Sequence, residues 1–139
     1  MSFSARRISE ELASNKGKKI IIVTAVKDED EPYIVTNAKT SQPGKHGSAK
    51  TALRLKHYFT HRVSEIIVGA TQKLDSMKEH ALYSVGTGIV LNYDPHNKVV
   101  EIADLDQQIL SLPCETLPET SEIQYESWDR KYFRIKESA

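Results

Sequence analysis

One short stretch of this sequence brings together residue types that could act on another macromolecule. Residues 41–50 read Ser-Gln-Pro-Gly-Lys-His-Gly-Ser-Ala-Lys, so Lys45 directly follows Gly44 and lies two positions before Gly47. Glycine has no Cβ, and a lysine bracketed by glycines is therefore open on both sides, with an ammonium that can reach beyond the body of the protein. Such a lysine suits two kinds of chemistry, covalent modification by an enzyme or contact with the phosphate backbone of a nucleic acid.

The residues around this stretch predict a β-hairpin with Lys45 at its tip. The flanking runs at 33–38 and 49–58 are short and rich in β-branched, aromatic and aliphatic residues, which favours strands. Between them, proline and glycine are turn formers, proline through its fixed φ and glycine through its free φ. Lys39 and Lys50 then fall at the two feet of the hairpin, where they could touch phosphate or simply keep the strand ends soluble.

The sequence matches none of the enzyme motifs that these residue types could suggest. A phosphate-binding loop of the Gly-x-x-x-x-Gly-Lys-Ser/Thr type needs glycine and a hydroxyl residue where the sequence has Lys39 and His46. No carboxylate or nucleophile lies near His46 in the sequence to form a proton relay. Ser41, Ser48 and Cys114 lack the motifs of catalytic nucleophiles, and the histidines show no zinc spacing. We therefore expect neither catalysis nor a metal site.

A net charge of zero hides an uneven distribution along the chain. Residues 32–64 hold six Lys and Arg and no acid, whereas residues 65–139 hold seven bases and thirteen acids. This asymmetry predicts a basic working end that meets nucleic acid and an acidic end that faces elsewhere. His57 and His61 fall in the basic segment, and we expect both at the rim of a barrel, facing RNA.

The rest of the composition is that of an ordinary soluble protein. No apolar run approaches the roughly 20 residues that cross a bilayer, so we expect no membrane partner. Cys114 is the only cysteine, which excludes an internal disulfide. A reducing, cytoplasmic setting is the simplest interpretation.

The apolar pattern predicts an all-β protein made of two small barrels, without a long helix. Residues 1–16 are polar and are expected to form a flexible N-terminus. Short strands follow one another over 17–77, and the pattern restarts over 78–139 as a meander with two closing strands. Five short strands in the second region fit an OB-type barrel, whose negative charge argues against RNA stacking on its aromatic rings. Most of these rings are expected in the core or in protein contacts: Tyr83, Tyr93, Tyr125 and Trp128.

Residues 40–50 resemble the hypusine loop of the translation initiation factor 5A family, whose members are relatives of bacterial elongation factor P. The likeness is strongest over Pro-Gly-Lys-His-Gly-Ser-Ala-Lys and looser at 58–60, 64–67 and 83–85. It implies an SH3-like N-terminal domain followed by an OB-fold domain. It also implies that Lys45 becomes hypusine, through deoxyhypusine synthase, which transfers an aminobutyl group from spermidine, and then a hydroxylase, with no other cofactor.

By the same resemblance, the protein would be a translation factor and not an enzyme. It would bind the ribosome next to the peptidyl-tRNA, near the exit site, and promote peptide-bond formation at stalled sites such as polyproline, as well as termination. A rival interpretation stays open, in which an unmodified ribosome-associated or RNA-binding β-barrel acts through a basic patch. The residues expected to contact large-subunit RNA or tRNA are Lys39, Gly44, Lys45, His46, Gly47, Lys50 and Arg54.

Four features depart from the family pattern, although the loop itself is intact. Gln42 stands where many members have lysine, which leaves the loop with one charge fewer. Residues 28–31 lengthen an early hairpin, and His61 occupies a turn position where glycine is usual. The sequence from about residue 112 onward aligns poorly. These departures are those expected of a divergent member.

Overall fold

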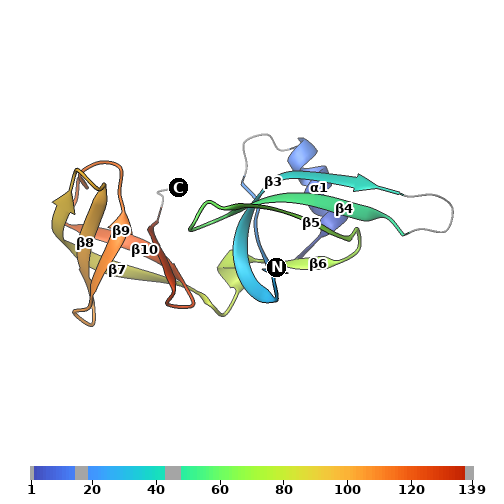
Figure 1. Cartoon of the computed structure of the whole chain (residues 1–139). Helices are drawn as coiled ribbons and strands as arrows, with labels where there is room; N and C mark the ends of the chain where they lie inside the picture. The colour runs from blue at the N-terminus through green and yellow to red at the C-terminus, as the bar shows by residue number, and fades with distance from the viewer. Residues whose placement is uncertain (1, 15–18, 43–47, 137–139) are drawn as a thin grey trace. The chain divides into compact units, whose positions relative to one another are not determined.

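The computed structural model of the chain describes residues 2–14, 19–42 and 48–136, and β-strands dominate them (Figure 1). The chain divides into two compact units, Met1–His80 and Ala81–Ala139, each with its own antiparallel sheet. The division falls three residues beyond the boundary expected between positions 77 and 78. Within the described residues, no helix is long and apolar enough to span a membrane.

The N-terminal unit is a six-stranded sheet of the SH3-like type, with the strand order β1-β6-β2-β3-β4-β5. Its core gathers aliphatic residues from several strands together with Tyr33. Apolar and polar residues alternate along strand β4. Because alternate side chains point to opposite sides of a sheet, one face of the strand is buried and the other is exposed. Leu53 and Leu55 are buried, whereas Lys50 and Arg54 are exposed. The elements of this unit are β1 (Ser2–Ser4), α1 (Ala5–Ser14), β2 (Ile21–Val26), β3 (Glu29–Ser41), β4 (Lys50–His57), β5 (Val63–Gly69), β6 (Lys73–Ser76) and the 3-10 helix η1 (Met77–Glu79).

Residues 2–14 form a strand and a helix, which corrects for these residues the expectation of a flexible N-terminus over 1–16. Strand β1 pairs with β6, with Phe3 opposite Leu74, and helix α1 follows directly. The helix buries Ala5 and Ile8 completely and packs Leu12 against the core. Only three residues of this polar helix face the core, which is a weak signal in the sequence, and the stability of such a helix comes from its tertiary contacts.

The C-terminal unit is a five-stranded sheet with the strand order β11-β10-β7-β8-β9, as expected for an OB-fold. The two outer strands, β9 and β11, also contact each other, so the sheet nearly closes. Gly86 lies opposite Tyr125 in the ladder of β7 and β10, and glycine makes room for the Tyr125 ring, which a Cβ at that position would overlap. The strands are β7 (Tyr83–Asp94), β8 (Val99–Asp104), β9 (Ile109–Pro113), β10 (Glu122–Trp128) and β11 (Tyr132–Ile135).

The aromatic residues of this unit serve its interior. Tyr125 and Trp128 are buried, and Tyr125 belongs to the core cluster with Val100 and Ile102. The Tyr83 hydroxyl donates a hydrogen bond of 2.6 Å to Oε2 of the buried Glu126. Burial, and then the hydrogen bond and charge of Glu126, raise the pKa of Tyr83 above its ordinary value. This phenol therefore remains a protonated donor at neutral pH.

Candidate nucleic-acid interface

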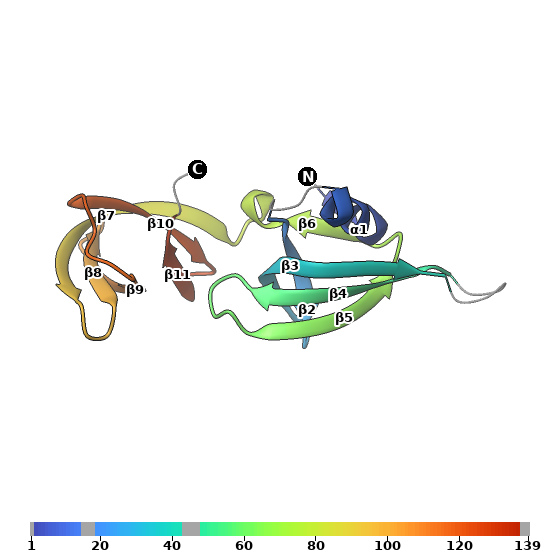
Figure 2. The same cartoon turned by 90° about the horizontal axis from the view of Figure 1, so that it is seen from above.

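The hairpin predicted around residues 41–50 is formed by β3 and β4. Their ladder begins at Tyr33 opposite His57 and ends at Ser41 opposite Lys50. Both strands extend side by side beyond the rest of the sheet in Figure 1 and Figure 2. A β-bulge at Thr36 interrupts the register, and bulges increase the local twist of a strand pair. The second half of β3 therefore leaves the buried sheet and becomes largely exposed.

Three of the site residues predicted from sequence share the outward face of this hairpin. Lys50 and Arg54 lie on β4 on either side of Ala52, and Lys39 of β3 pairs directly with Ala52. All three basic side chains are exposed, so they surround one small residue with positive charge. The structure therefore brings Lys39, Lys50 and Arg54 together. The other four predicted residues, Gly44, Lys45, His46 and Gly47, lie outside the described residues.

Sequence reasoning missed the aliphatic part of this face. Ile67 of β5 pairs with Ala52 and is 74% exposed, and Val63 pairs with Lys56 and is 58% exposed. The signal was present in the sequence, because alternation along β5 directs every second residue outward. We use the name hairpin face for seven exposed residues of these three strands that lie on the outward side around Ala52. Its members are Lys39, Lys50, Ala52, Arg54, Val63, Glu65 and Ile67.

The two units carry opposite net charges. Met1–His80 holds 14 Lys and Arg against 9 Asp and Glu, a net charge of +5, and Ala81–Ala139 holds 5 against 10, a net charge of −5. On the hairpin face, Glu65, opposite Arg54, is the only acid, so the face itself is positive. Positive faces of this kind attract phosphate backbones.

A chain of hydroxyl groups holds the inner side of the hairpin against helix α1. Thr51 Oγ1 lies 2.9 Å from Thr40 Oγ1, which lies 2.8 Å from Ser9 Oγ of the helix. Ser9 Oγ donates its hydrogen to the carbonyl oxygen of Arg6 at 2.7 Å. A hydroxyl has only one hydrogen, so Thr40 must donate to Ser9 and Thr51 must donate to Thr40. The hydroxyl chain thus has a single direction, from the buried Thr51 of β4 through Thr40 to the helix.

This direction predicts unequal effects for two matched substitutions. Thr40→Val leaves the hydroxyl hydrogen of Thr51, which is fully buried, without an acceptor. We expect a loss of about 1–3 kcal/mol in the free energy of unfolding, the cost of an orphaned buried donor. Thr51→Val removes that donor itself, and we expect a loss of under about 1 kcal/mol. Urea denaturation of both variants measures the difference, and equal losses would contradict the assigned direction.

The other end of β4 carries a buried polar cluster around His57. Its Nδ1 accepts hydrogen bonds from the backbone N–H groups of Phe59 and Thr60, both at 3.1 Å. The ring hydrogen therefore sits on Nε2, which points at Glu31 Oε2 at 3.4 Å. His57 is only 3% exposed, which corrects the expectation that it lies at the rim and faces RNA. It closes the turn between β4 and β5 instead.

Within the same turn, His61 adopts a left-handed backbone with φ of 64°. L-residues pay about 1–2 kcal/mol for this conformation, which glycine adopts freely. The departure noted at this position is therefore confirmed as a turn that favours glycine. Among the described residues, no group of three or more His, Cys, Asp or Glu side chains could hold a metal ion.

Comparisons with known proteins decide what this arrangement resembles. No family model and no curated protein matches the sequence. Solved structures match along almost the whole chain. The eukaryotic translation initiation factor 5A from Methanococcus jannaschii has a TM-score of 0.57 at 20% identity, covering 98% of this chain and 92% of its own. A translation initiation factor 5A family protein from Naegleria fowleri has a TM-score of 0.53 at 20% identity, covering 99% and 96%.

The chain has the factor 5A fold. The expected fold class is confirmed, with an SH3-like sheet followed by an OB-fold sheet in an all-β chain. The low identity fits a divergent sequence on a shared fold. In this fold, the chain carries its Gly-Lys-His-Gly sequence between β3 and β4, at the end of the ladder that closes with Ser41 and Lys50.

Proposed function

We propose that this protein is a translation factor that acts on the ribosome and not an enzyme. The observation that carries the proposal is the hairpin of β3 and β4, which has an exposed basic face and whose connecting sequence contains Lys45. The shared fold supports it, since both similar structures are of translation initiation factor 5A proteins. In this proposal the hairpin face lies against large-subunit RNA next to the peptidyl-tRNA, near the exit site, in the cytoplasm.

The proposal includes covalent modification of Lys45. Deoxyhypusine synthase would join the aminobutyl group of spermidine to the lysine nitrogen, and a hydroxylase would complete hypusine. A longer side chain with two amines could reach between RNA backbones and hold the acceptor end of the tRNA in a reactive orientation. Positioning of reactants alone can lower a reaction barrier by several kcal/mol, about 7–11 in the best intramolecular cases. Stalled sites such as polyproline, and termination, are the steps that such help would serve.

The hairpin face also supports the rival function, an RNA-binding or ribosome-associated protein that works unmodified. Three exposed cations next to an exposed isoleucine provide phosphate contacts and an apolar surface without any change to Lys45. In the rival, Lys39, Lys50 and Arg54 would carry all of the binding. In the leading proposal they bring the factor to its site, and Lys45 acts there.

Both functions predict that ribosome binding depends on the hairpin face and on salt. Lys50→Glu and Arg54→Glu should each weaken binding to purified ribosomes. Each should also reduce the steepness of the plot of log affinity against log salt concentration by about one unit per lost phosphate contact. Sedimentation of ribosomes with the protein at a series of salt concentrations measures both quantities.

Lys73→Glu provides a matched control, because it makes the same change of charge in the same unit. Lys73 is an exposed lysine of β6, outside the hairpin face. Its variant should retain nearly the original affinity and slope. If the hairpin variants bind like the original protein at every salt concentration, this face is not the contact surface, and the proposed placement fails.

A further inference from the structure

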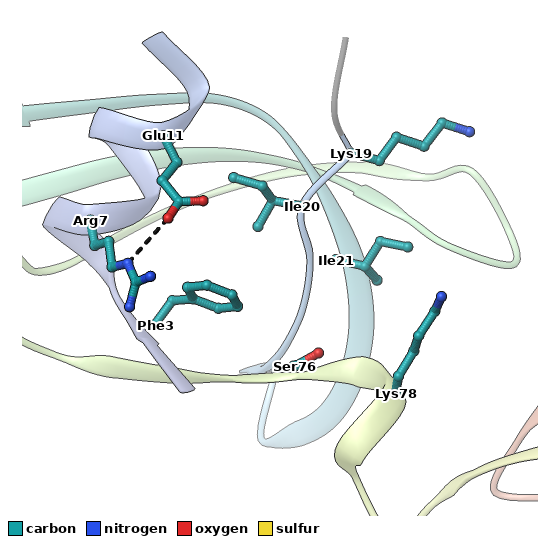
Figure 3. Close-up of a pocket in the computed structure, with 8 residues that line it drawn as sticks. All are labelled: Phe3, Arg7, Glu11, Lys19, Ile20, Ile21, Ser76 and Lys78. Carbon is teal, nitrogen blue, oxygen red and sulfur yellow. Dashed lines mark hydrogen bonds and ion pairs between the residues drawn. The ribbon is translucent and has the colours of Figure 1, made fainter. Parts of the chain in front are cut away.

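A cavity of about 500 Å³ lies in the N-terminal unit, formed by elements that do not include the hairpin. Its size falls within the range of about 300–1,000 Å³ that is usual for small-ligand sites. Strand β1 and helix α1 form one side, and the start of β2 and helix η1 form the other (Figure 3). The lining residues are Phe3, Arg7, Glu11, Lys19, Ile20, Ile21, Ser76 and Lys78.

The floor of the cavity is apolar. Figure 3 shows Phe3 and Ile20 between the two sides, with Ile21 farther along the strand. Phe3 also packs against the hydrophobic core, which holds its ring in place. A flat, weakly polar group would find van der Waals contact here, and the aromatic ring adds a stacking surface.

The two sides carry positive charge in excess. Arg7 lies on one side, and Lys19 and Lys78 lie on the other. Arg7 contacts two neighbours, because its Nε lies 3.1 Å from Glu11 Oε1 and its guanidinium sits 5.3 Å from the centre of the Phe3 ring. Among the described residues, neither the terminal nitrogens of Arg7 nor the ammonium of Lys78 has a hydrogen-bond partner. These donors are therefore available to an anion.

Together, the floor and the sides select a ligand with a flat ring and an anionic group. An inorganic anion would leave the apolar floor in contact with water, and an acyl chain would meet polar walls. A nucleoside phosphate covers the apolar floor and also matches the cationic sides. Its base would lie on Phe3 and Ile20, and its phosphate between Arg7 and Lys78. Glu11 and Ser76 offer polar atoms to the edge of the base.

We propose that this cavity binds a nucleoside phosphate, either as a free mononucleotide or as one nucleotide of an RNA strand. The inference does not rest on the proposed function. None of the residues Lys39, Lys50 and Arg54 lines the cavity.

Calorimetric titration with AMP and fluorescence anisotropy with a labelled hexa-adenylate distinguish the two sources. If AMP alone saturates the cavity, the ligand is a free nucleotide. If only the hexa-adenylate binds, and the cavity variants weaken it, the ligand is a nucleotide of a strand. Arg7→Gln and Lys78→Gln should each weaken the observed binding by about tenfold or more, the usual effect of losing a charge-assisted contact to phosphate.

Lys73→Gln is the matched control. It removes one exposed lysine of β6, five residues before Lys78, and Lys73 does not line the cavity. Its affinity should stay within about twofold of the original, well below the tenfold step of one lost contact. Phe3→Leu retains an apolar floor but removes the stacking surface, and it should weaken AMP while leaving inorganic phosphate unchanged. Thermal denaturation checks that each variant is folded, and Lys78→Gln changes an exposed side chain only.

The double variant Lys50→Glu with Arg54→Glu separates this inference from the proposed function. It should keep its affinity for AMP even where ribosome binding is lost. The proposal is overturned if neither AMP nor the hexa-adenylate binds, if the Arg7 and Lys78 variants bind like the original, or if inorganic phosphate binds as tightly as AMP. It is also overturned if a poly-glutamate peptide displaces the nucleotide with higher affinity, since the site would then serve an acidic protein segment.

Discussion

Replacing Lys45 with arginine should reduce the activity of this protein on stalled ribosomes to nearly the level of Lys45→Ala. Arginine keeps the positive charge and contacts phosphate at least as well as lysine does. It cannot accept the aminobutyl group of spermidine, so the extension and the second amine are both lost. A translation assay on a polyproline message, with protein from a host that carries the modifying enzymes, measures the effect.

The arginine variant also decides between the two proposed functions. If the hairpin acts only as a basic patch, the Lys45→Arg variant should be almost fully active, whereas the Lys45→Ala variant should have lower activity. Mass spectrometry must show that the original protein is modified at Lys45 for the comparison to count. Full activity of the arginine variant beside modified original protein would reject the mechanism that depends on modification. The stability of the fold should not change, because the loop sequence predicts a surface position for Lys45 and surface substitutions usually alter stability by less than about 0.5 kcal/mol.

Replacing His57 with alanine should lower the free energy of unfolding of the N-terminal unit by about 2–4 kcal/mol. The change removes the acceptor for the N–H groups of Phe59 and Thr60 and leaves the buried Glu31 with one contact fewer. It also empties the space of the ring that packs edge-on against Tyr33, with centroids 5.3 Å apart. Urea denaturation followed by circular dichroism measures the loss.

Two further variants complete the test: one restores a hydrogen-bond acceptor at position 57, and the other is a control at an exposed histidine. Asparagine has a side-chain oxygen near the position of Nδ1 and commonly accepts from backbone N–H groups two and three residues ahead. His57→Asn should therefore recover part of the stability that alanine loses. His96→Ala, at an exposed histidine of the C-terminal unit, should change stability by less than about 0.5 kcal/mol. A His57→Ala variant as stable as His96→Ala would refute the structural role of the buried ring.

The hairpin was predictable because its information is local. Alternation of apolar and polar residues along β4 assigns each side chain to a face, and proline and glycine mark the connection to β3. The run of bases without acids over 32–64 then places positive charge on the outward face. The same rule, applied to β5, would also have placed Ile67 on that face.

Other features depended on partners distant in the sequence. Polarity alone suggested that His57 is exposed, but Glu31 and the folded turn provide it with hydrogen bonds that make burial possible. Helix α1 has too few apolar residues to be stable alone, and it forms because the sheet buries Ala5 and Ile8. The donor direction along Thr51, Thr40 and Ser9 likewise follows from contacts between residues far apart in the sequence.

The sequence by itself determined the basic hairpin and the all-β, two-part organisation, since each follows from residue types within a few positions of one another. Only the tertiary structure revealed the cavity between α1 and β2. Its lining comes from positions as far apart as Phe3 and Lys78, which have no shared pattern in the chain. They meet because β1 pairs with β6 and β6 pairs with β2, a strand order that local sequence does not specify.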